Sequence, residues 1–162
     1  MFYNRLMIVD AIETDWPLIE GLAEAAEVFS EEELDALSAV LEEYALLGPG
    51  DSGYDFLVDR VDDRILGFVC FGPRDLTDGV CELYYLAVDP SSRNQNVGTR
   101  LLKAAEAEAR EAGARMMIAE TSSAPRFGGG GDFCLKAGYQ VEAGIRDFYA
   151  MGEDLAVFVK RF

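Results

Sequence analysis

The sequence predicts one compact α/β domain (α+β in some classification schemes), with helices dispersed around a mixed sheet. The chain of 162 residues is about one domain long, half of it is hydrophobic, and it contains neither an internal repeat nor a domain linker. Hydrophobic spacing predicts elements in the order β, α, α, β, β, β, α, β, α, β, β. About seven strands and about four helices in this order fit a single layered domain.

The first predicted elements are a strand and a helix. Residues Leu6 to Ile12 have the pattern of a short strand. Thr14 or Asp15 can cap the helix that follows, and Pro17 is tolerated in its first turn. The face of this helix expected to be buried consists of Leu18, Leu22, Ala25, Ala26 and Phe29.

A second helix is expected directly after the first. Ser30 and Glu33 have the spacing of a capping box, which predicts where this helix begins. Gly48-Pro49-Gly50 is expected to end it. Its expected buried face consists of Leu34, Leu37, Leu41 and Tyr44.

Three strands are predicted after the second helix. Tyr54 to Val61 is rich in β-forming residues, and Asp62-Asp63 supplies a turn. Ile65 to Phe71 is an apolar run typical of a buried strand. Val80 to Val88 is the third strand, and Asp89-Pro90 ends it.

A long amphipathic helix is predicted from Gly98 to Ala112, with Gly113 as its C-terminal stop. Its expected inner face consists of Val97, Leu101, Ala105, Ala109 and Ala112. The side chains expected to face water are Arg100, Lys103, Glu106 and Arg110. The remaining predicted elements are a strand from Arg115 to Thr121, a glycine loop from Gly128 to Gly131, a short helix through Ala137, and strands from Tyr139 to Phe148 and Leu155 to Phe162.

The composition excludes several classes of function. Asp and Glu number 30 against 14 Lys and Arg, for a formal charge of −16, which argues against nucleic acids and anionic membranes as partners. The chain has no histidine, which removes Ser-His-Asp and Cys-His catalysis and histidine-ligated zinc. We therefore expect no metal, and acid–base chemistry that uses carboxylates, Tyr, Lys or Cys. The acidity fits either a GC-rich genome or adaptation to high salt, where screening weakens self-repulsion.

The cysteines and the hydropathy pattern predict a cytoplasmic protein. Cys70, Cys81 and Cys134 are far apart and form no C-x-x-C motif, and we expect Cys70 and Cys81 to be buried, reduced thiols. No apolar run reaches the ~18–20 residues that a membrane helix needs. Residues Met1 to Asp10 lack the pattern of a signal peptide. Assembly into a homodimer is left open.

The most informative stretch is Glu82 to Leu102, which reads E-L-Y-Y-L-A-V-D-P-S-S-R-N-Q-N-V-G-T-R-L-L. It predicts a buried strand, a short polar loop and a helix that begins at once. The first turn of such a helix presents unpaired N–H groups and partial positive charge, which favour a phosphate or pyrophosphate. On its own the pattern also fits a turn that binds nothing. It is neither a Walker A motif nor G-x-G-x-x-G.

Two motifs in the chain resemble those of a known family. The run L-A-V-D-P-x-x-R-N-Q-N-V-G-T-R-L-L and the segment F-C-L-K-A-G-Y (Phe133 to Tyr139) are similar to motif A and to F-Y-x-K-x-G-F of the GCN5-related N-acetyltransferases, the GNAT superfamily. Arg93 and Gly98 match motif A, whereas Asn96 replaces its first glycine; Asn tolerates a left-handed conformation. With the order of the elements, the resemblance implies one N-acetyltransferase-like domain over residues 1–162.

The resemblance also implies acetyl-CoA as a cosubstrate. In the family, N–H groups of the loop and of the helix start hold the pyrophosphate, and the splayed end of the preceding strand pairs with the pantetheine arm and the thioester carbonyl. The residues that this implies for cofactor binding are Leu86, Ala87, Val88, Arg93, Asn94, Gln95, Asn96, Val97, Gly98 and Thr99. The glycines at 128–131 either form a surface loop or let the backbone approach the ligand closely.

Two residues are candidates for proton transfer. Glu82 lies in an apolar strand, where a charge is costly unless it is exposed or paired. Strand alternation predicts one shared face for Glu82, Tyr84, Leu86 and Val88. The resemblance implies Glu82 as the general base for an amine with a pKa of about 10, often through water; the alternative is a structural, salt-bridged or exposed Glu. Cys134 stands where the family often has a Tyr that acts as the general acid and protonates the departing thiolate. Cys134 either donates that proton or packs near the cofactor sulfur.

The implied acetyl acceptor is a primary amine, either a small molecule or a peptide. The family builds its acceptor site from segments that correspond to Ala26 to Leu47 and Arg146 to Asp154. In the second segment, the acids that could attract an amine and the aromatic residues that could flank it are Asp147, Glu153, Asp154, Phe148 and Tyr149, although such a charged loop can equally be solvated surface. The alternative functions are a non-catalytic coenzyme A-binding sensor or partner-binding module, and a structural protein that binds no coenzyme A.

Overall fold

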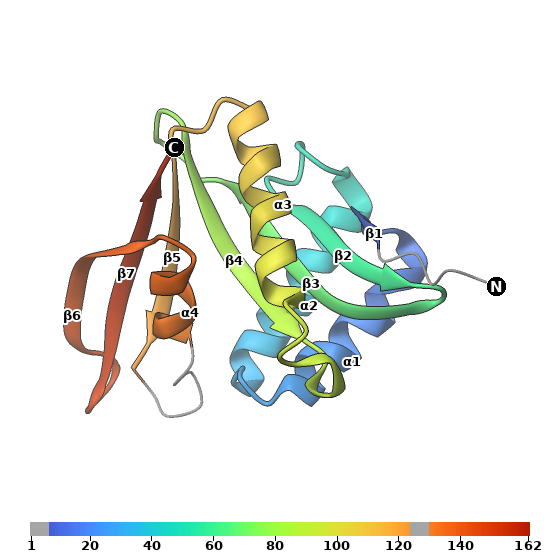
Figure 1. Ribbon diagram of the computed structural model, residues 1–162, viewed down its shortest axis with the longest axis horizontal. Coiled ribbons are helices and arrows are strands. Elements are labelled where there is room, and N and C mark those ends of the chain that lie inside the picture. The colour runs from blue at the N-terminus through green and yellow to red at the C-terminus, as the bar shows by residue number, and fades with distance from the viewer. Residues whose placement is uncertain (1–6, 124–129) are drawn as a thin grey trace.

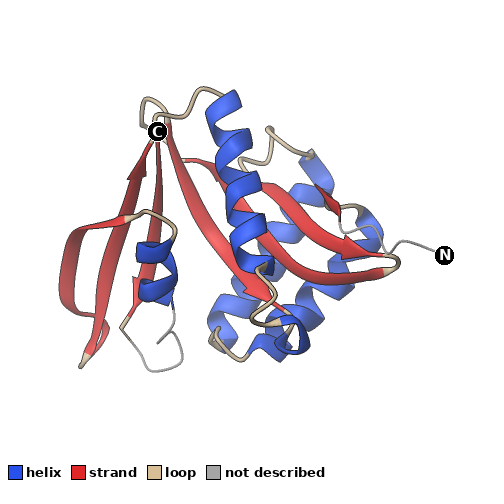
Figure 2. Cartoon of the chain, in the orientation of Figure 1, coloured by secondary structure: helices blue, strands red, loops and turns tan. Residues whose placement is uncertain are grey.

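The computed structural model describes residues 7–123 and 130–162, and places helices on both faces of one mixed sheet (Figures 1 and 2). The strands are β1 (Met7–Asp10), β2 (Asp55–Val61), β3 (Arg64–Pro73), β4 (Val80–Val88), β5 (Met116–Ser122), β6 (Gln140–Ala150) and β7 (Glu153–Arg161). The helices are α1 (Trp16–Ala26), α2 (Glu31–Leu47), α3 (Val97–Glu111) and α4 (Gly130–Lys136), with 3₁₀ turns at Glu13–Asp15 and Pro90–Ser92. The predicted fold class and order of elements are confirmed.

The sheet is divided near its middle by the only parallel pair among the described strands. The strand order is β1-β2-β3-β4-β5-β7-β6, and β4 runs parallel to β5 through the crossover helix α3. The register of this pair ends where Leu83 faces Ala119. Figure 1 shows the two strands diverging beyond that point. This is the splay that the family resemblance implies, and it leaves part of β4 without a neighbour among the described strands on its β5 side.

Each face of the sheet carries its own hydrophobic core. On one face, α3 packs through residues such as Val97 and Leu101 in a cluster that also holds Cys134 of α4. On the opposite face, Ile19 of α1 and Leu37 of α2 belong to a second cluster. Figure 1 shows α3 and α4 in front of the sheet and α1 and α2 behind it. Any cavity between β4 and β5 therefore lies between the two helical layers.

The starts of the first two helices differ in how they are capped. The capping box at α2 is confirmed, because the Glu33 N–H donates to Ser30 Oγ at 3.2 Å and the Ser30 N–H donates to Glu33 Oε2 at 2.6 Å. Asp15 precedes α1 but makes no side-chain cap. Its carboxylate accepts instead from the Ile12 N–H and from Arg60 of β2.

The buried face of α1 differs from the prediction. The buried residues are Ile19, Leu22, Ala23 and Ala26, whereas Leu18 and Ala25 are exposed. Leu18 and Ile19 are equally apolar, so spacing alone cannot select between two faces one residue apart. The 3₁₀ turn before α1 and the anchoring of Asp15 set the rotation of the helix against the sheet.

One flank of α3 is buried where water was expected. Glu106 is 6% exposed, accepts hydrogen bonds from the Tyr139 hydroxyl at 3.1 Å and from Lys160 Nζ at 2.8 Å, and so cannot be a water-facing residue. Packing of β7 and of the segment after α4 against this flank explains the difference. Ala112, expected inside, is exposed at the end of the helix, and Gly113 follows it with a φ of +91°.

A bulge in β4 reverses the alternation of its side chains. Cys70 of β3 pairs with Tyr85, but the next residue, Phe71, pairs with Leu83. Tyr84 is therefore the extra residue, and an extra residue shifts every following side chain to the other face.

The bulge makes the predicted shared face of β4 wrong. Leu83, Leu86 and Val88 pack in the cluster that contains α3. The side chains that pack on the side of α1 and α2 are Tyr84, Tyr85 and Ala87. Glu82 is next to Leu83 in the regular part of the strand and so points to the second side, away from Leu86 and Val88.

Candidate functional site

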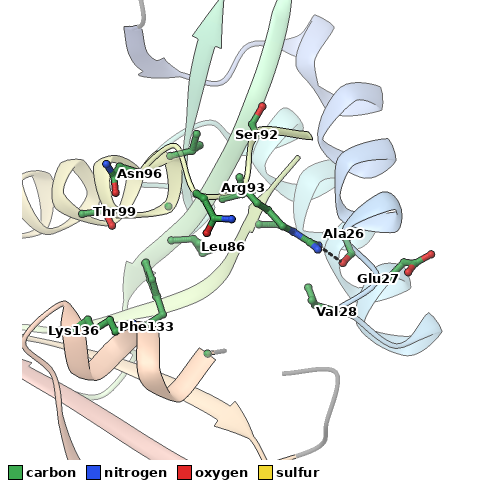
Figure 3. A pocket seen from close by; sticks show the side chains of 16 residues that line it. Ala26, Glu27, Val28, Leu86, Ser92, Arg93, Asn96, Thr99, Phe133 and Lys136 are labelled. Atoms are coloured by element: carbon green, nitrogen blue, oxygen red, sulfur yellow. Dashed lines mark hydrogen bonds between the residues drawn. The ribbon is translucent and has the colours of Figure 1, made fainter. Parts of the chain in front are cut away.

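A cleft of about 840 Å³ lies at the N-terminal end of α3, where the sequence predicts an anion site (Figure 3). We call it the α3 cleft. Its lining residues are Ala26, Glu27, Val28, Leu86, Ala87, Val88, Ser92, Arg93, Asn94, Asn96, Val97, Gly98, Thr99, Gly130, Phe133 and Lys136. All of the residues predicted to bind the cofactor line it except Gln95. Gln95 donates from Nε2 to the Ser91 carbonyl at 3.4 Å instead.

The loop before α3 presents the first turn of the helix to the cleft. Asn94 and Asn96 have left-handed conformations, with φ of +62° and +59°, so the conformation expected of Asn96 is confirmed. The Asn96 side chain makes no capping hydrogen bond. The residues of the first turn, Val97 to Thr99, line the cleft. Uncapped amides at a helix N-terminus are well suited to a negatively charged group.

Arg93 acts as an anchor for this loop. Its Nη2 atom donates a hydrogen bond of 2.9 Å to the Ala26 carbonyl, as the dashed line in Figure 3 shows. Ala26 is the last residue of α1, where helix carbonyls lack partners within the helix. The guanidinium thus ties the loop to the opposite wall of the cleft.

A buried ion pair holds the other side of the loop. The Asp59 side chain on β2 is fully buried, and its Oδ2 atom accepts from Arg100 Nε at 3.0 Å and Nη2 at 2.6 Å. Arg100 Nη1 donates to the Gln95 carbonyl at 2.8 Å. Arg100 was predicted to face water, and that prediction is wrong. Asp59 was not predicted as a site residue, although an Asp within the apolar run F-L-V-D is a visible signal.

A second cavity, of about 280 Å³, joins the α3 cleft through the splay of β4 and β5. We call it the β4–β5 slot. It shares Leu86, Gly130 and Phe133 with the α3 cleft. Its other lining residues are Phe29, Glu33, Leu83, Tyr84, Ala119, Glu120, Thr121, Ser122, Cys134 and Tyr149. Because these residues come from helices on both faces of the sheet, the slot connects the two sides.

The part of the slot near α2 is acidic. Glu33 of α2 and Glu120 of β5 both line it, together with Tyr149 of β6. Burial, then the charges of Glu120 and Glu33, raises the pKa of the Tyr149 hydroxyl. Glu120 was not predicted as a site residue, since its only signal in the sequence is an acid directly after the apolar residues of the strand.

The predicted acceptor loop contributes less than expected. Of its residues, only Tyr149 lines the slot. Asp147 Oδ1 accepts from the Gly152 N–H at 2.6 Å, and Asp154 Oδ1 accepts from the Asp147 N–H at 2.9 Å. These two carboxylates shape the β6–β7 hairpin.

Glu82 is buried and ion-paired. It is 8% exposed, and its Oε2 atom accepts from Arg74 Nη1 at 2.5 Å. Glu82 does not line the slot itself, whereas Tyr84 does. Burial first, and then the charge of Glu82, raises the pKa of Tyr84. The Glu82 carboxylate is therefore near enough to the tyrosine that lines the slot to raise its pKa.

All three cysteines are buried, free thiols, as expected for Cys70 and Cys81. Cys134 on α4 lines the slot, and burial raises its pKa to about 11. Gly130 and Gly131 form the start of α4, so the predicted glycine loop is helical at its end. Gly128 and Gly129 lie outside the described residues.

Two further findings concern the described residues alone. Within residues 7–123 and 130–162, no helix combines the length and the hydropathy that a membrane span requires. The same part of the chain brings together no group of three or more Cys, Asp or Glu side chains that could hold a metal ion.

Comparison with solved structures finds the same architecture elsewhere. A GNAT family protein from Desulfovibrio desulfuricans is 28% identical, with a TM-score of 0.92 and coverage of 97% of this chain and 99% of that chain. The yncA protein from Salmonella typhimurium, solved with its cofactor acetyl-CoA, is 22% identical, with a TM-score of 0.74 and coverage of 98% and 94%. Ribosomal-protein-alanine N-acetyltransferase from Brucella melitensis is 21% identical, with a TM-score of 0.76 and coverage of 97% and 100%.

Comparison at the level of sequence agrees with the structures. No curated protein gives a significant match. The family model described as "Acetyltransferase (GNAT) family" matches residues 11–126, which is well over half of the chain and includes β4, α3 and the loop between them. The chain therefore belongs to the acetyltransferase (GNAT) family.

Proposed function

We propose that this protein is an N-acetyltransferase that transfers acetyl from acetyl-CoA to a primary amine by direct attack in a ternary complex. The observation that carries the proposal is the continuity of the α3 cleft with the β4–β5 slot through the splay of the sheet. The cleft suits an anion, and the acidic end of the slot suits a cation. A thioester placed in the slot would lie between them.

The residues of the α3 cleft fit acetyl-CoA. The amides of Val97 to Thr99 would hold the pyrophosphate, since the Asn96 side chain does not cap them. Beyond Leu83, none of the described strands pairs with β4 on its β5 side, so its backbone groups can pair with an extended pantetheine arm. The solved structure of yncA with acetyl-CoA supports this choice of cosubstrate.

Glu82 would act as the general base. It takes one proton from the ammonium group of the acceptor, the freed nitrogen attacks the thioester carbonyl carbon, and the C–S bond breaks to release the thiolate of coenzyme A. The second proton leaves the nitrogen for solvent as the amide forms. Because Glu82 does not line the slot and is paired with Arg74, the proton would travel through a water molecule. The Arg74 side chain is 47% exposed, so it can turn into solvent when the acceptor binds. General-base catalysis contributes about 10²–10⁴-fold to a rate.

Cys134 would pack against the thioester and leave proton donation to solvent. A thiol with a pKa of about 11 transfers its proton uphill to a thiolate whose thiol has an ordinary pKa of about 8.5. The thiolate of coenzyme A is itself an adequate leaving group. Cys134→Ala should therefore keep kcat within about threefold of the wild-type value.

Replacement of Glu82 or Glu120 by Gln tests which of the two carboxylates is the general base. In a thiol-release assay over a panel of primary amines, Glu82→Gln should lower kcat at least a hundredfold and leave the affinity for acetyl-CoA unchanged. Glu120→Gln is the matched comparison, and it should mainly raise KM for the amine. A hundredfold fall in kcat for Glu120→Gln, with only a rise in KM for Glu82→Gln, would assign the base to Glu120. Failure of acetyl-CoA to bind at millimolar concentration would overturn the proposal as a whole.

The ion pair of Arg74 with Glu82 favours a second candidate function. If this pair never opens, the fold is a non-catalytic coenzyme A-binding sensor or partner-binding module. Calorimetry would then show binding of acetyl-CoA, while no amine in the panel would release thiol. Arg74→Gln distinguishes the enzyme from the non-catalytic module. Loss of the guanidinium should raise the rate of thiol release only in an enzyme in which Glu82 must be freed from Arg74 before it can act as the base.

A further inference from the structure

All three lysines of this acidic chain lie around one small cavity. The sequence contains only Lys103, Lys136 and Lys160, against a formal charge of −16. The cavity has a volume of about 240 Å³ and lies between α3, α4 and β7. Its lining residues are Thr99, Leu102, Lys103, Glu106, Phe133, Lys136, Ala137 and Lys160. We call it the lysine pocket.

The lysine pocket carries a local positive charge. Lys160 Nζ is held by both oxygens of Glu106, at 3.0 and 2.8 Å. Lys103 and Lys136 are exposed, and among the described residues neither has a hydrogen-bond or ion-pair partner. Three ammonium groups against the single carboxylate of Glu106 leave two positive charges. The net charge of the whole chain is −16, so a cluster of lysines at one cavity indicates a binding site for an anion.

Lys160 also prepares the pocket for negative charge. Its Nζ atom donates a hydrogen bond of 2.9 Å to the Ala137 carbonyl, just beyond the last residue of α4. The carbonyls at a helix C-terminus carry partial negative charge that repels anions. Because Lys160 neutralises this end of α4, the ammonium groups of Lys103 and Lys136 are left to act on a ligand.

The lysine pocket adjoins the α3 cleft. Thr99, Phe133 and Lys136 line both cavities. Figure 3 shows Phe133 and Lys136 on α4 across the cleft from Thr99 in the first turn of α3. A group bound in the lysine pocket would therefore lie next to a pyrophosphate bound at that turn.

We propose that Lys103 and Lys136 bind the 3′-phosphate on the ribose of coenzyme A and make the protein selective for the 3′-phosphorylated cofactor. The inference rests on the proposed function, which places the pyrophosphate at the first turn of α3. In coenzyme A the adenosine follows the pyrophosphate on the side opposite to pantetheine, and its 3′-phosphate is a near-dianion. Two free ammonium groups match that charge in a cavity that adjoins the proposed pyrophosphate site.

Calorimetry with two cofactors tests the inference. The probes are acetyl-CoA and acetyl-3′-dephospho-CoA, titrated into the full-length protein at 50 and 200 mM KCl. The wild type should bind acetyl-CoA about tenfold more tightly at 50 mM, and this preference should shrink at the higher salt concentration because the contacts are exposed to solvent. The double variant Lys103→Gln/Lys136→Gln should bind both cofactors with the affinity that the wild type has for the dephosphorylated one.

Arg161→Gln is the matched control. Arg161 follows Lys160 on β7, pairs with Glu142 of β6, and lines none of the three cavities described above. The substitution removes one positive charge and leaves the lysine pocket unchanged, so the tenfold preference for acetyl-CoA over its dephosphorylated form should remain. The inference is wrong if the wild type binds both cofactors equally, or if Arg161→Gln loses the preference as fully as the double variant. Absence of binding for both cofactors would instead refute the proposed function.

Discussion

The buried ion pair of Asp59 and Arg100 should control both the stability of the fold and the shape of the loop that faces the α3 cleft. Asp59→Asn removes the charge while keeping the size of the side chain. Loss of one partner of a buried pair typically costs about 3–5 kcal/mol, because the other charge is left uncompensated. The Arg100 side chain is 33% exposed and Asn keeps one acceptor oxygen, so we expect about 2–3 kcal/mol here.

The expected loss can be converted into a melting temperature. Unfolding entropy of about 2.1 cal/mol/K per residue gives about 0.34 kcal/mol/K for 162 residues. A loss of about 2–3 kcal/mol should therefore lower Tm by about 6–9 °C in a thermal melt followed by circular dichroism. The matched control is Asp63→Asn in the exposed turn of the same hairpin, which should change Tm by about 1 °C or less.

The same pair should affect cofactor binding through the Gln95 carbonyl. Without Asp59 to fix it, Arg100 holds that carbonyl less firmly, and the affinity for acetyl-CoA should fall about fivefold, which corresponds to about 1 kcal/mol. The double variant Asp59→Leu/Arg100→Met separates the two effects. An apolar pair can recover stability, but it cannot restore the hydrogen bond to Gln95.

Two results would refute this reasoning. A change in Tm below about 2 °C for Asp59→Asn would mean that the pair does not stabilise the fold. Recovery of acetyl-CoA affinity together with Tm in the double variant would mean that Arg100 does not position the loop.

Three further predictions concern the fold and its charge. Gly72→Ala should lower the free energy of unfolding by at least about 2 kcal/mol in urea, because the added Cβ would meet the Gly53 carbonyl oxygen, whereas Gly21→Ala, in open space on α1, should raise it by about 0.5–1 kcal/mol. The contribution of Cys134 to stability should be constant below about pH 8.5 and be lost as the pH rises to about 11, because the folded pKa of Cys134 is raised and the unfolded thiol ionises first; Cys134→Ala should flatten part of that alkaline fall. Tm should rise between 0.1 and 2 M KCl as salt screens the charge of −16, and an unchanged midpoint would contradict the high-salt hypothesis.

Local signals were enough to predict the elements and several of their ends. Ser30 and Glu33 form the predicted capping box, and Gly113 follows α3 in a left-handed conformation. Asn96 adopts the left-handed conformation that replaces the glycine of motif A. These features depend on residues within one turn of each other, so a linear pattern contains all of the information they need.

Pairings between distant segments could not be predicted in the same way. Glu106 and Arg100 both lie on the polar side of α3 in the linear pattern, but each is bound to a partner at least 33 residues away. Glu120 was overlooked because its position in the slot depends on where β5 leaves β4. The charged residues of a helix do not indicate which strand or other helix will pack over them.

By itself the sequence determined the order of strands and helices, the anion-ready turn at Val97 to Thr99, and the absence of histidine that leaves acid–base chemistry to carboxylates, Tyr, Lys or Cys. Only the tertiary structure decided how β4 is used. Its register with β3 creates the bulge at Tyr84, which turns Glu82 away from Leu86. Its divergence from β5 beyond Leu83 opens the β4–β5 slot next to the α3 cleft. The physical reason is that a bulge and a splay are properties of two paired strands, and neither strand encodes them alone.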